Sequence, residues 1–437
     1  MIFGLSPVWV AAVILVVTYV LVISDRFDRS IIAILGGGTM ILSGVLTQDE
    51  AIKGVDFNTI ALLTGMMVLV SVARRSGIFE YLAIWSAQLV KGSPAGVLCL
   101  LSLVTAVVSA LLDNVTTVLL IAPVTLSITQ RLRVPPFPFL ICEVLASNIG
   151  GTATLIGDPP NIMIGSAAGL TFNDFVLHLT PVILVVMACQ VVATHLLWGR
   201  STEATSAARA EVMALDAASA IVDRRLLVQS VSVFVVILLA FVFARFIHLD
   251  PGTIALGGAA TLMLVDNLAH HREVQLQKVA GTYGDIDWIT IFFFVGLFVV
   301  VHGLEVTGAL GVIAGQLVAA VHGNLALAAS VILWASALLS AVVDNIPFVA
   351  AMIPLIKLLA PELGGDEALL PLWWSLSLGA CLGGNGTLIG ASANLTVAGI
   401  AQRNGIRFDF LTYSKYAAPL TLMSVAICQI YLWLRYF

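Results

Sequence analysis

The sequence predicts an all-α polytopic membrane protein with two inverted-topology repeats, about ten transmembrane helices, two re-entrant hairpins and two broken helices. Three observations lead to this fold class. The 437-residue chain is 60% hydrophobic and only 10% charged, with a mean hydropathy of +1.06, whereas an average soluble domain is roughly 25% charged. Apolar runs of about 17 to 25 residues, the length of a bilayer-crossing helix, recur throughout. A pair of polar motifs, the second of them glycine-rich, occurs twice.

The two repeats are related by a nearly constant offset along the chain. Asp56 matches Asp287, and the same spacing of 231 positions continues as far as Pro123 and Pro354. The spacing becomes 233 in the glycine-rich motifs, so only two inserted residues separate the registers. The first repeat is therefore expected at 1–198 and the second at 226–437. The polar stretch 199–225 between them is expected to be a partly helical cytoplasmic linker.

The first repeat is expected to begin with scaffold helices within 8–73, at 8–24, 31–46 and 57–73. The amphipathic stretch 78–91 is too short and mixed to cross a membrane and is expected along its inner surface. Two apolar arms within 94–130 flank a polar turn, and basic residues at both ends predict a re-entrant hairpin, with a pair of full crossings as the alternative. A broken helix at 137–169 and a helix at 175–198 complete this repeat.

The second repeat is expected to begin on the opposite side of the membrane. Scaffold helices are predicted within 226–303, followed by a surface helix near 308–322 and a hairpin at 325–360. A broken helix at 371–398 and a helix at 413–435 end the chain. Because cytoplasmic loops carry an excess of lysine and arginine, the distribution of these residues predicts that both termini lie outside.

The hairpin turns carry the first residues of chemical interest. Asp113 and Asp344 occupy matching positions between apolar arms, and an ionisable group at membrane depth is a functional hypothesis by default. Both could instead be N-caps, whose carboxylates accept hydrogen bonds from free amides of the following helix. Asn114 and Asn345 follow them, and each offers both a carbonyl and an amide group to a polar ligand.

The glycine-rich motifs, 150–161 and 383–394, interrupt the two helices that are expected to be broken. Glycine and proline break the helical hydrogen-bond ladder and expose backbone groups near the middle of the membrane. Two such breaks at matching positions favour a central binding site. Asp158 matches Ala391, so it is either a carboxylate with an asymmetric task such as proton handling or a loop residue near the surface.

Several other functions are disfavoured by the sequence. Neither glycine-rich motif has the GxxxxGK[ST] pattern of a phosphate-binding loop, and no nucleophile with its base or set of metal ligands is recognisable, so we expect neither an enzyme nor a cofactor or metal site. No basic cluster resembles a nucleic-acid footprint. Glu143 lies in the helix before the first break and is expected to make an interhelical hydrogen bond.

The motifs resemble a known family. The runs Asp113-Asn114-Val115-Thr116-Thr117 and 146–161, together with Asp344-Asn345-Ile346-Pro347 and 383–390, closely resemble the arsenical-pump branch of the ion transporter superfamily. This branch includes ArsB-type arsenite permeases and the pigmentation P protein and is related to divalent anion/sodium symporters. The resemblance implies a homodimer in the inner (plasma) membrane, in which a scaffold holds a transport domain that moves like an elevator.

The resemblance also implies a function. We expect secondary active efflux of arsenite and antimonite in exchange for entering protons, because a carboxylate at each hairpin tip, where the dicarboxylate branch has serine, disfavours a dianionic substrate. The residues expected to bind the substrate are Asn114, Thr116, Asn148, Thr152, Thr154, Asn345, Asn385 and Thr387. Those expected to couple protons are Asp113, Asp344 and Asp158. A sodium/proton antiporter or another anion transporter of the superfamily is the main alternative, and a channel-like or receptor protein is a further one. An arsenite-stimulated cytoplasmic ATPase is a partner that the resemblance permits.

Overall fold

The computed structural model describes residues 6–24, 26–199, 202–311, 314–316, 323–363 and 365–437, which form helices and no strand. The first repeat contains α1 (Pro7–Ile23), α2 (Arg29–Leu42), α3 (Gln48–Gly54), α4 (Phe57–Arg74), α5 (Ile78–Leu89), α6 (Pro94–Leu111), α7 (Asn114–Leu132), α8 (Phe137–Thr152), α9 (Pro159–Ala168), α10 (Phe172–His178), α11 (Thr180–Thr194) and the π-helical turn η1 (His195–Gly199). The linker contains α12 (Ser206–Met213) and the 3₁₀ turn η2 (Ala217–Ala220).

The second repeat follows the same order of elements. It contains α13 (Arg224–Val242), α14 (Ala244–Ile247), α15 (Pro251–Asn267), α16 (Arg272–Gly284), α17 (Trp288–Thr307), α19 (Leu325–Ser340), α20 (Asn345–Leu363), η3 (Asp366–Leu369), α21 (Leu370–Gly383), η4 (Gly384–Gly386), α22 (Ser392–Arg403) and α23 (Phe410–Tyr436). The first residues of α17, α19 and α20 lie 231 positions after those of α4, α6 and α7, and those of α21 and α22 lie 233 after those of α8 and α9. The duplication is therefore present in the helices themselves.

The two repeats interlock through their scaffold helices. Helix α2 packs against α17 of the second repeat, and α15 packs in the same way against α4 of the first. Glycines at matching positions permit both crossings: a Cβ at Gly65 would lie 2.6 Å from the Ala255 carbonyl carbon, and one at Gly296 would lie 2.3 Å from that of Ala33. Real Cβ contacts are longer than this, so neither pair of helices could pack so closely around a larger residue.

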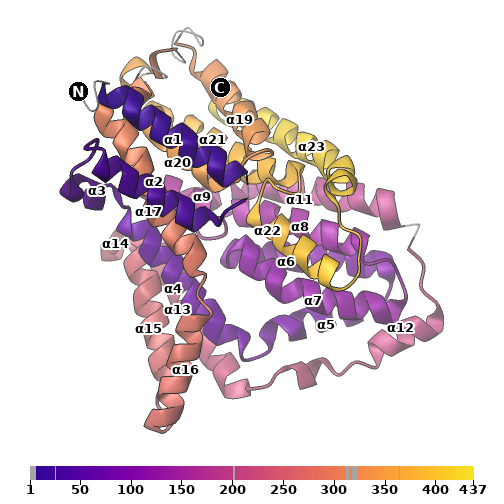
Figure 1. Ribbon diagram of the computed structural model, residues 1–437. Coiled ribbons are helices and arrows are strands. Elements are labelled where there is room, and N and C mark those ends of the chain that lie inside the picture. Colours follow the sequence, from indigo (N-terminus) through magenta and orange to yellow (C-terminus); the bar gives the residue numbers. More distant parts are fainter. Residues whose placement is uncertain (1–5, 25, 200–201, 312–313, 317–322, 364) are drawn as a thin grey trace.

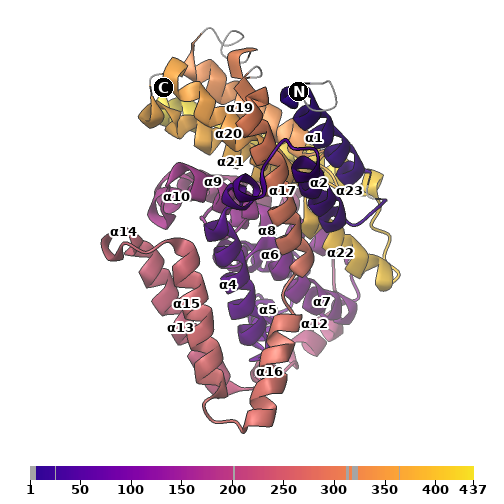
Figure 2. The ribbon, with the colours of Figure 1, turned by 60° about the vertical axis from the view of Figure 1, so that its left-hand side comes forward.

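The hairpins and broken helices also exchange contacts between repeats. Within each repeat the first hairpin arm packs on the first half of the broken helix, α6 on α8 and α19 on α21. The second half of each broken helix packs instead on the second hairpin arm of the other repeat, α9 on α20 and α22 on α7. Figures 1 and 2 show α22, coloured yellow, near α7, coloured purple, although the chain separates them widely. Both hairpin tips consequently reach the same central region.

Seven helices in the described part of the chain are long and apolar enough to cross a membrane. They are α4, α6, α7, α11 with its π-helical extension, α13, α17 and α23, and shorter apolar helices accompany them. The arms α6 and α7 have 18 and 19 residues, so each is long enough to cross a membrane. Arm length therefore does not separate a hairpin from a crossing pair, and the central position of the tip is the feature that favours the hairpin.

Some elements differ from the sequence-based expectation. Helices α3 and α16 were not predicted, because α3 is short and α16 is polar, whereas the prediction rested on long apolar runs. The expected helix 31–46 ends at Leu42, and the expected helix 175–198 is divided between α10 and α11. The surface helix expected near 308–322 falls largely outside the described residues. In Figure 1 the start of α1 and the end of α23 lie at one end of the molecule, whereas α12 and α16 lie toward the other.

Candidate functional site

The first hairpin tip is anchored by its own helix and by the broken helix. Asp113 is the N-cap of α7, and its carboxylate accepts a hydrogen bond of 2.7 Å from the backbone amide of Thr116. The amide group of Asn114 donates to the side-chain oxygen of Asn148 on α8, at 2.9 Å. The N-cap role proposed from the sequence is therefore present, and it leaves the carboxylate of Asp113 at the edge of the central cavity described below.

Four asparagines from both repeats form a buried cluster behind that tip. The amide group of Asn148 donates to Asn385 at 2.8 Å and to Asn394 at 3.0 Å, and Asn114 completes the chain of bonds. All four side chains are nearly inaccessible to solvent. Because each amide offers two donors and accepts through its oxygen, the cluster joins the first hairpin to both broken helices without placing a net charge in the interior.

Side chains at matching positions of the two repeats form hydrogen bonds with the free backbone carbonyls in the helix breaks. Asn161 donates to the carbonyls of Thr152 and Thr154, and Asn394 donates to those of Gly384 and Thr387. The hydroxyl of Thr154 donates to the carbonyl of Ala110 at 2.5 Å, and that of Thr387 donates to the carbonyl of Ala341. These bonds satisfy carbonyls that an uninterrupted helix would have used internally, so the broken geometry is stabilised in both repeats by the same device.

A cavity of about 190 Å³, with charged and polar residues as well as apolar ones on its wall, lies where the first hairpin tip, the breaks and the scaffold helices α4 and α17 meet. Its charged wall residues among those described are Asp113, Asp158, Asp285, Asp287, Arg29 and Arg74. Asn114, Thr116 and Asn345 contribute neutral polar groups. The carboxyl groups outnumber the guanidinium groups by four to two, so the cavity wall favours cationic or neutral solutes over anions.

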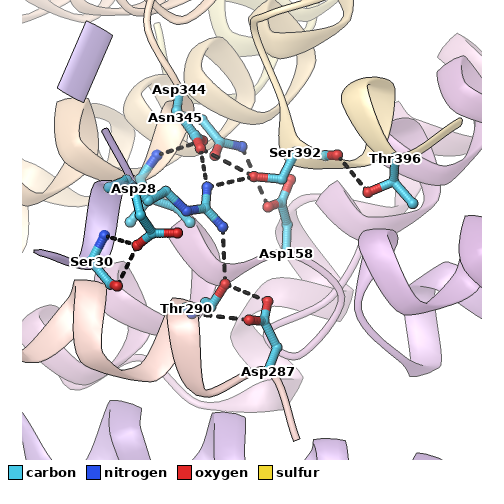
Figure 3. Close-up of polar contacts among 11 residues, drawn as sticks. Asp28, Ser30, Asp158, Asp287, Thr290, Asp344, Asn345, Ser392 and Thr396 are labelled. Atoms are coloured by element: carbon cyan, nitrogen blue, oxygen red, sulfur yellow. Dashed lines mark hydrogen bonds and ion pairs between the residues drawn. The ribbon is translucent and has the colours of Figure 1, made fainter. Parts of the chain in front are cut away.

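The second hairpin tip is held by an arginine of the scaffold. The guanidinium of Arg29, at the start of α2, donates to the carboxylate of Asp344 at 2.7 Å and to the hydroxyl of Ser392 at 2.7 Å. Its other terminal nitrogen donates to the hydroxyl of Thr290 at 2.9 Å, and that hydroxyl donates to Asp287. Figure 3 shows Asp344, directly before α20, converging with Ser392 of α22 and Thr290 of α17. Arg29 therefore connects the scaffold helices α2 and α17 to the second hairpin tip and to α22.

The residue Asp158 lies between the two tips. It precedes α9, is 1% exposed, and accepts a long hydrogen bond of 3.4 Å from the side-chain amide of Asn345. Its second oxygen is buried without a partner among the described residues. Figure 3 places Asp158 beside Asn345 and near Ser392. The alternative of a surface loop residue is therefore wrong, and Asp158 is a buried carboxylate on the cavity wall.

All but one of the residues proposed from the sequence fall into two groups. Those on the wall of the central cavity are Asp113, Asn114, Thr116, Asp158 and Asn345. Those that instead hold the breaks together through hydrogen bonds behind the wall are Asn148, Thr152, Thr154, Asn385 and Thr387. Asp344 belongs to neither group, because it lines a neighbouring cavity of about 300 Å³ together with Asp28 and Arg29.

Sequence reasoning missed several wall residues. Arg29 and Arg74 were used only as markers of the cytoplasmic side, and Asp285, Thr290 and Ser392 were not proposed at all. Asp287 could have been found, because it matches Asp56 in the repeat and both carboxylates cap the scaffold helices α4 and α17. No pattern in the sequence points to Arg29, because its role depends on a contact with a residue 363 positions away.

Glu143 has the structural role that was expected from the sequence. It is 1% exposed on α8, and the hydroxyl of Thr125 on α7 donates to its carboxyl group. It does not line the central cavity. The interhelical hydrogen bond links the second hairpin arm to the broken helix, some distance along both helices from the hairpin tip.

Inverted repeats whose hairpin tips and broken helices meet at a polar cavity define a membrane transporter. Comparison with known proteins agrees with this class. The chain belongs to the citrate transporter family (CitMHS), whose model matches residues 19–379. The resemblance to the ion transporter superfamily is thereby confirmed, whereas membership of its arsenical-pump branch stays a prediction.

Relatives of known sequence and structure support the family assignment. The chain is 44% identical to an uncharacterized transporter of Mycobacterium tuberculosis over 98% of both proteins. It is 33% identical to the P protein of Homo sapiens over 98% of this chain and 60% of that protein. Among solved structures, the YdaH transporter of Alcanivorax borkumensis is similar with a TM-score of 0.62 and 16% identity, covering 98% of this chain and 96% of the other. At that identity the likeness concerns the fold alone.

Proposed function

We propose that this protein is a secondary active transporter that exchanges protons for a small neutral or cationic solute, with cytoplasmic arsenite or antimonite as the first candidate. The observation that carries the proposal is the charge of the central cavity. Asp113 and Asp158 line it and have no ion pair among the described residues. A carboxylate in this position can take up a proton on one side of the membrane and release it on the other.

The neutral groups on the wall suit a hydroxylated solute. Asn114, Asn345 and Thr116 offer donors and acceptors at the two hairpin tips, and arsenite and antimonite are uncharged trihydroxides near neutral pH. A tricarboxylate such as citrate, after which the family is described, would meet four carboxyl groups in this cavity. Arg29 and Arg74 are the cationic groups described on its wall, and Arg29 is already paired with Asp344. The balance of charge therefore favours arsenite over citrate.

The main alternative is a sodium/proton antiporter, in which the same carboxylates bind the cation directly. The carboxyl groups of Asp113, Asp158, Asp285 and Asp287 around the same cavity support this reading, although no three of the described acidic or histidine side chains are grouped as an ion site. Both functions use proton exchange and differ in the solute. We further propose that the protein works as a homodimer and that the hairpins and broken helices move against the scaffold as an elevator.

Transport by the purified protein in lipid vesicles tests the proposal. A pH gradient is imposed, and arsenic, sodium and labelled citrate are measured in separate samples, with protein-free vesicles as the control. We expect saturable arsenic movement driven by the gradient. Sodium movement without arsenic movement would replace the first candidate by the antiporter, and citrate movement alone would contradict the charge argument.

A further inference from the structure

Another cavity of about 300 Å³, distinct from the one lined by Asp344, is called the second cavity below. It lies at the end of the scaffold helices α4 and α17 that is farther from the central cavity. Its wall includes Gly54 at the end of α3, Asp56 directly before α4, His302 and Glu305 near the end of α17, and Lys357 on α20. Helix α9 closes one side of it. None of the motifs singled out from the sequence includes these residues, and the first cavity shares none of them.

Seven wall positions of the second cavity correspond to wall positions of the central cavity through the repeat. Four positions on α4 that line the central cavity, Met67, Val70, Ser71 and Arg74, lie 231 residues before Phe298, Val301, His302 and Glu305 on the wall of the second. Asp285 and Asp287 likewise match Gly54 and Asp56. The agreement extends to the second arms of the two hairpins, where Leu119 on α7 matches Ala350 on α20. The second cavity therefore lies at the place that the pseudo-symmetry of the fold relates to the scaffold side of the central cavity.

Contacts between matched residues are repeated as well. Ser71 donates a hydrogen bond of 2.8 Å to Asp285, and the matching His302 lies so close to Gly54 that a Cβ there would be 2.7 Å from the histidine ring. The chemistry has diverged, because His302 pairs with Glu305 at 3.2 Å, where the first cavity has serine and arginine. The two walls thus share geometry and differ in side chains.

The cavities differ in how far they extend toward the hairpin tips. The central cavity includes Asp113 and Asn114 at the tip of the first hairpin. The second cavity reaches Ala350 on α20 but not Asp344 or Asn345 at the matching tip. About one and a half helical turns therefore separate its inner end from the tip. In this conformation one cavity is connected to the tips and the other is closed from them.

We propose that the second cavity is the other half of the transport route, through which the solute passes when the hairpins and broken helices have moved. Arg29 holds the present conformation, because it binds the second tip from the scaffold. When that ion pair breaks, the second cavity becomes continuous with the tips, and Asp56 lies there as Asp287 lies in the central cavity. The inference takes from the proposed function only that the protein alternates between two conformations.

Cysteine labelling at matched positions tests this inference without knowledge of the solute. Single variants Leu119→Cys and Ala350→Cys, and Lys357→Cys about 10 Å nearer the mouth of the second cavity, are treated with a membrane-impermeant methanethiosulfonate from each face of membrane vesicles. The parent chain, with its five native cysteines, gives the background. We expect Leu119→Cys to react from one face and Lys357→Cys to react readily from the opposite one.

The decisive position is Ala350→Cys, combined with Arg29→Met to release the ion pair. We expect it to react slowly from the face that labels Lys357→Cys, and about tenfold faster when Arg29 is replaced, because 1.4 kcal/mol of lost stabilisation changes a population tenfold. Reaction of Ala350→Cys from the face that labels Leu119→Cys, or no reaction in either background, would overturn the inference. A failure of arsenite transport in vesicles would leave this labelling pattern unchanged.

Discussion

The two hairpin tips share an Asp-Asn pair and have different surroundings. Each begins with aspartate and asparagine directly before a helix, and each tip asparagine bonds to a broken helix of the first repeat. Asp344 is paired with Arg29, whereas Asp113 has no ion pair in the described part of the chain. Duplication supplied the scaffold, and one arginine outside the tips made the two carboxylates different.

The origin of this difference is visible in the scaffold helices. Helices α2 and α15 are equivalent by their packing, on α17 and α4 respectively, and each follows an aspartate, Asp28 or Asp250. The first residue of α2 is Arg29, and that of α15 is Pro251. At this position the second repeat therefore has a proline where the first has the arginine that binds a hairpin tip. Under the proposed function, Asp113 is therefore the tip carboxylate that we expect to respond to a proton or a cation.

The largest expected effect follows from this comparison. Asp113→Asn removes the unpaired carboxylate while keeping the shape of the tip, and we expect it to abolish pH-driven transport in vesicles. Asp344→Asn leaves Arg29 bound to Thr290 and Ser392, and we expect a loss of no more than about tenfold, equivalent to 1.4 kcal/mol. Equal loss in both variants would show that the tips act alike, and normal transport by Asp113→Asn would remove the proton-coupling role.

A second pair of matched positions differs in its contribution to stability. Asn148 makes three side-chain hydrogen bonds to other asparagines, whereas its match Cys381 makes one weak contact of 3.6 Å with Asn161. Because each buried polar group left without a partner costs about 1–3 kcal/mol, we expect Asn148→Ala to reduce the free energy of unfolding by about 3 kcal/mol. Cys381→Ala should cost about 1 kcal/mol. Thermal unfolding of the two purified variants checks this, and equal shifts would contradict the asymmetry of the cluster.

The sequence predicts the duplicated parts of this molecule well, for a physical reason. Hairpin tips and helix breaks need particular residues in a fixed order, because caps, prolines and glycines act on their own local backbone. The starts of α7 and α20 directly after Asp113 and Asp344 are examples. Because these residues are needed at fixed places in each repeat, they recur at a constant spacing along the chain, and this spacing makes them recognisable in the sequence.

The sequence does not predict which polar residues face the cavity. Asn148 was expected to bind solute, but it lies behind the wall because α22 of the other repeat brings Asn394 against it. Arg29 reaches Asp344 across 315 residues, and this contact depends on how α2 crosses α17. Contacts of that kind are set by the interlocking of the repeats, which the offset alone does not describe.

The ion pair at the second tip has an intermediate expected effect. The side chains of Arg29 and Asp344 are 25% and 18% exposed, so their coupling should lie between that of a surface pair and that of a buried one, at about 1–2 kcal/mol. A double-mutant cycle of Arg29→Met and Asp344→Asn, with unfolding free energies as the readout, measures it. Arg26→Met, at an exposed residue nearby, is the control. A coupling of zero would mean that Arg29 does not hold this tip.

The smallest effect is expected at a carboxylate that is buried but lies away from the cavity. Glu143→Gln keeps the oxygen that accepts the hydrogen bond from Thr125, so we expect transport rates within about twofold of the parent and a change in unfolding free energy below about 1 kcal/mol. Burial alone would favour Glu143, which is 1% exposed, over the partly buried Asp113, whereas position on the cavity wall selects Asp113. If Glu143→Gln folds normally and loses its dependence on the pH gradient, burial is the better guide, and the proton route runs through α8 instead of the hairpin tip.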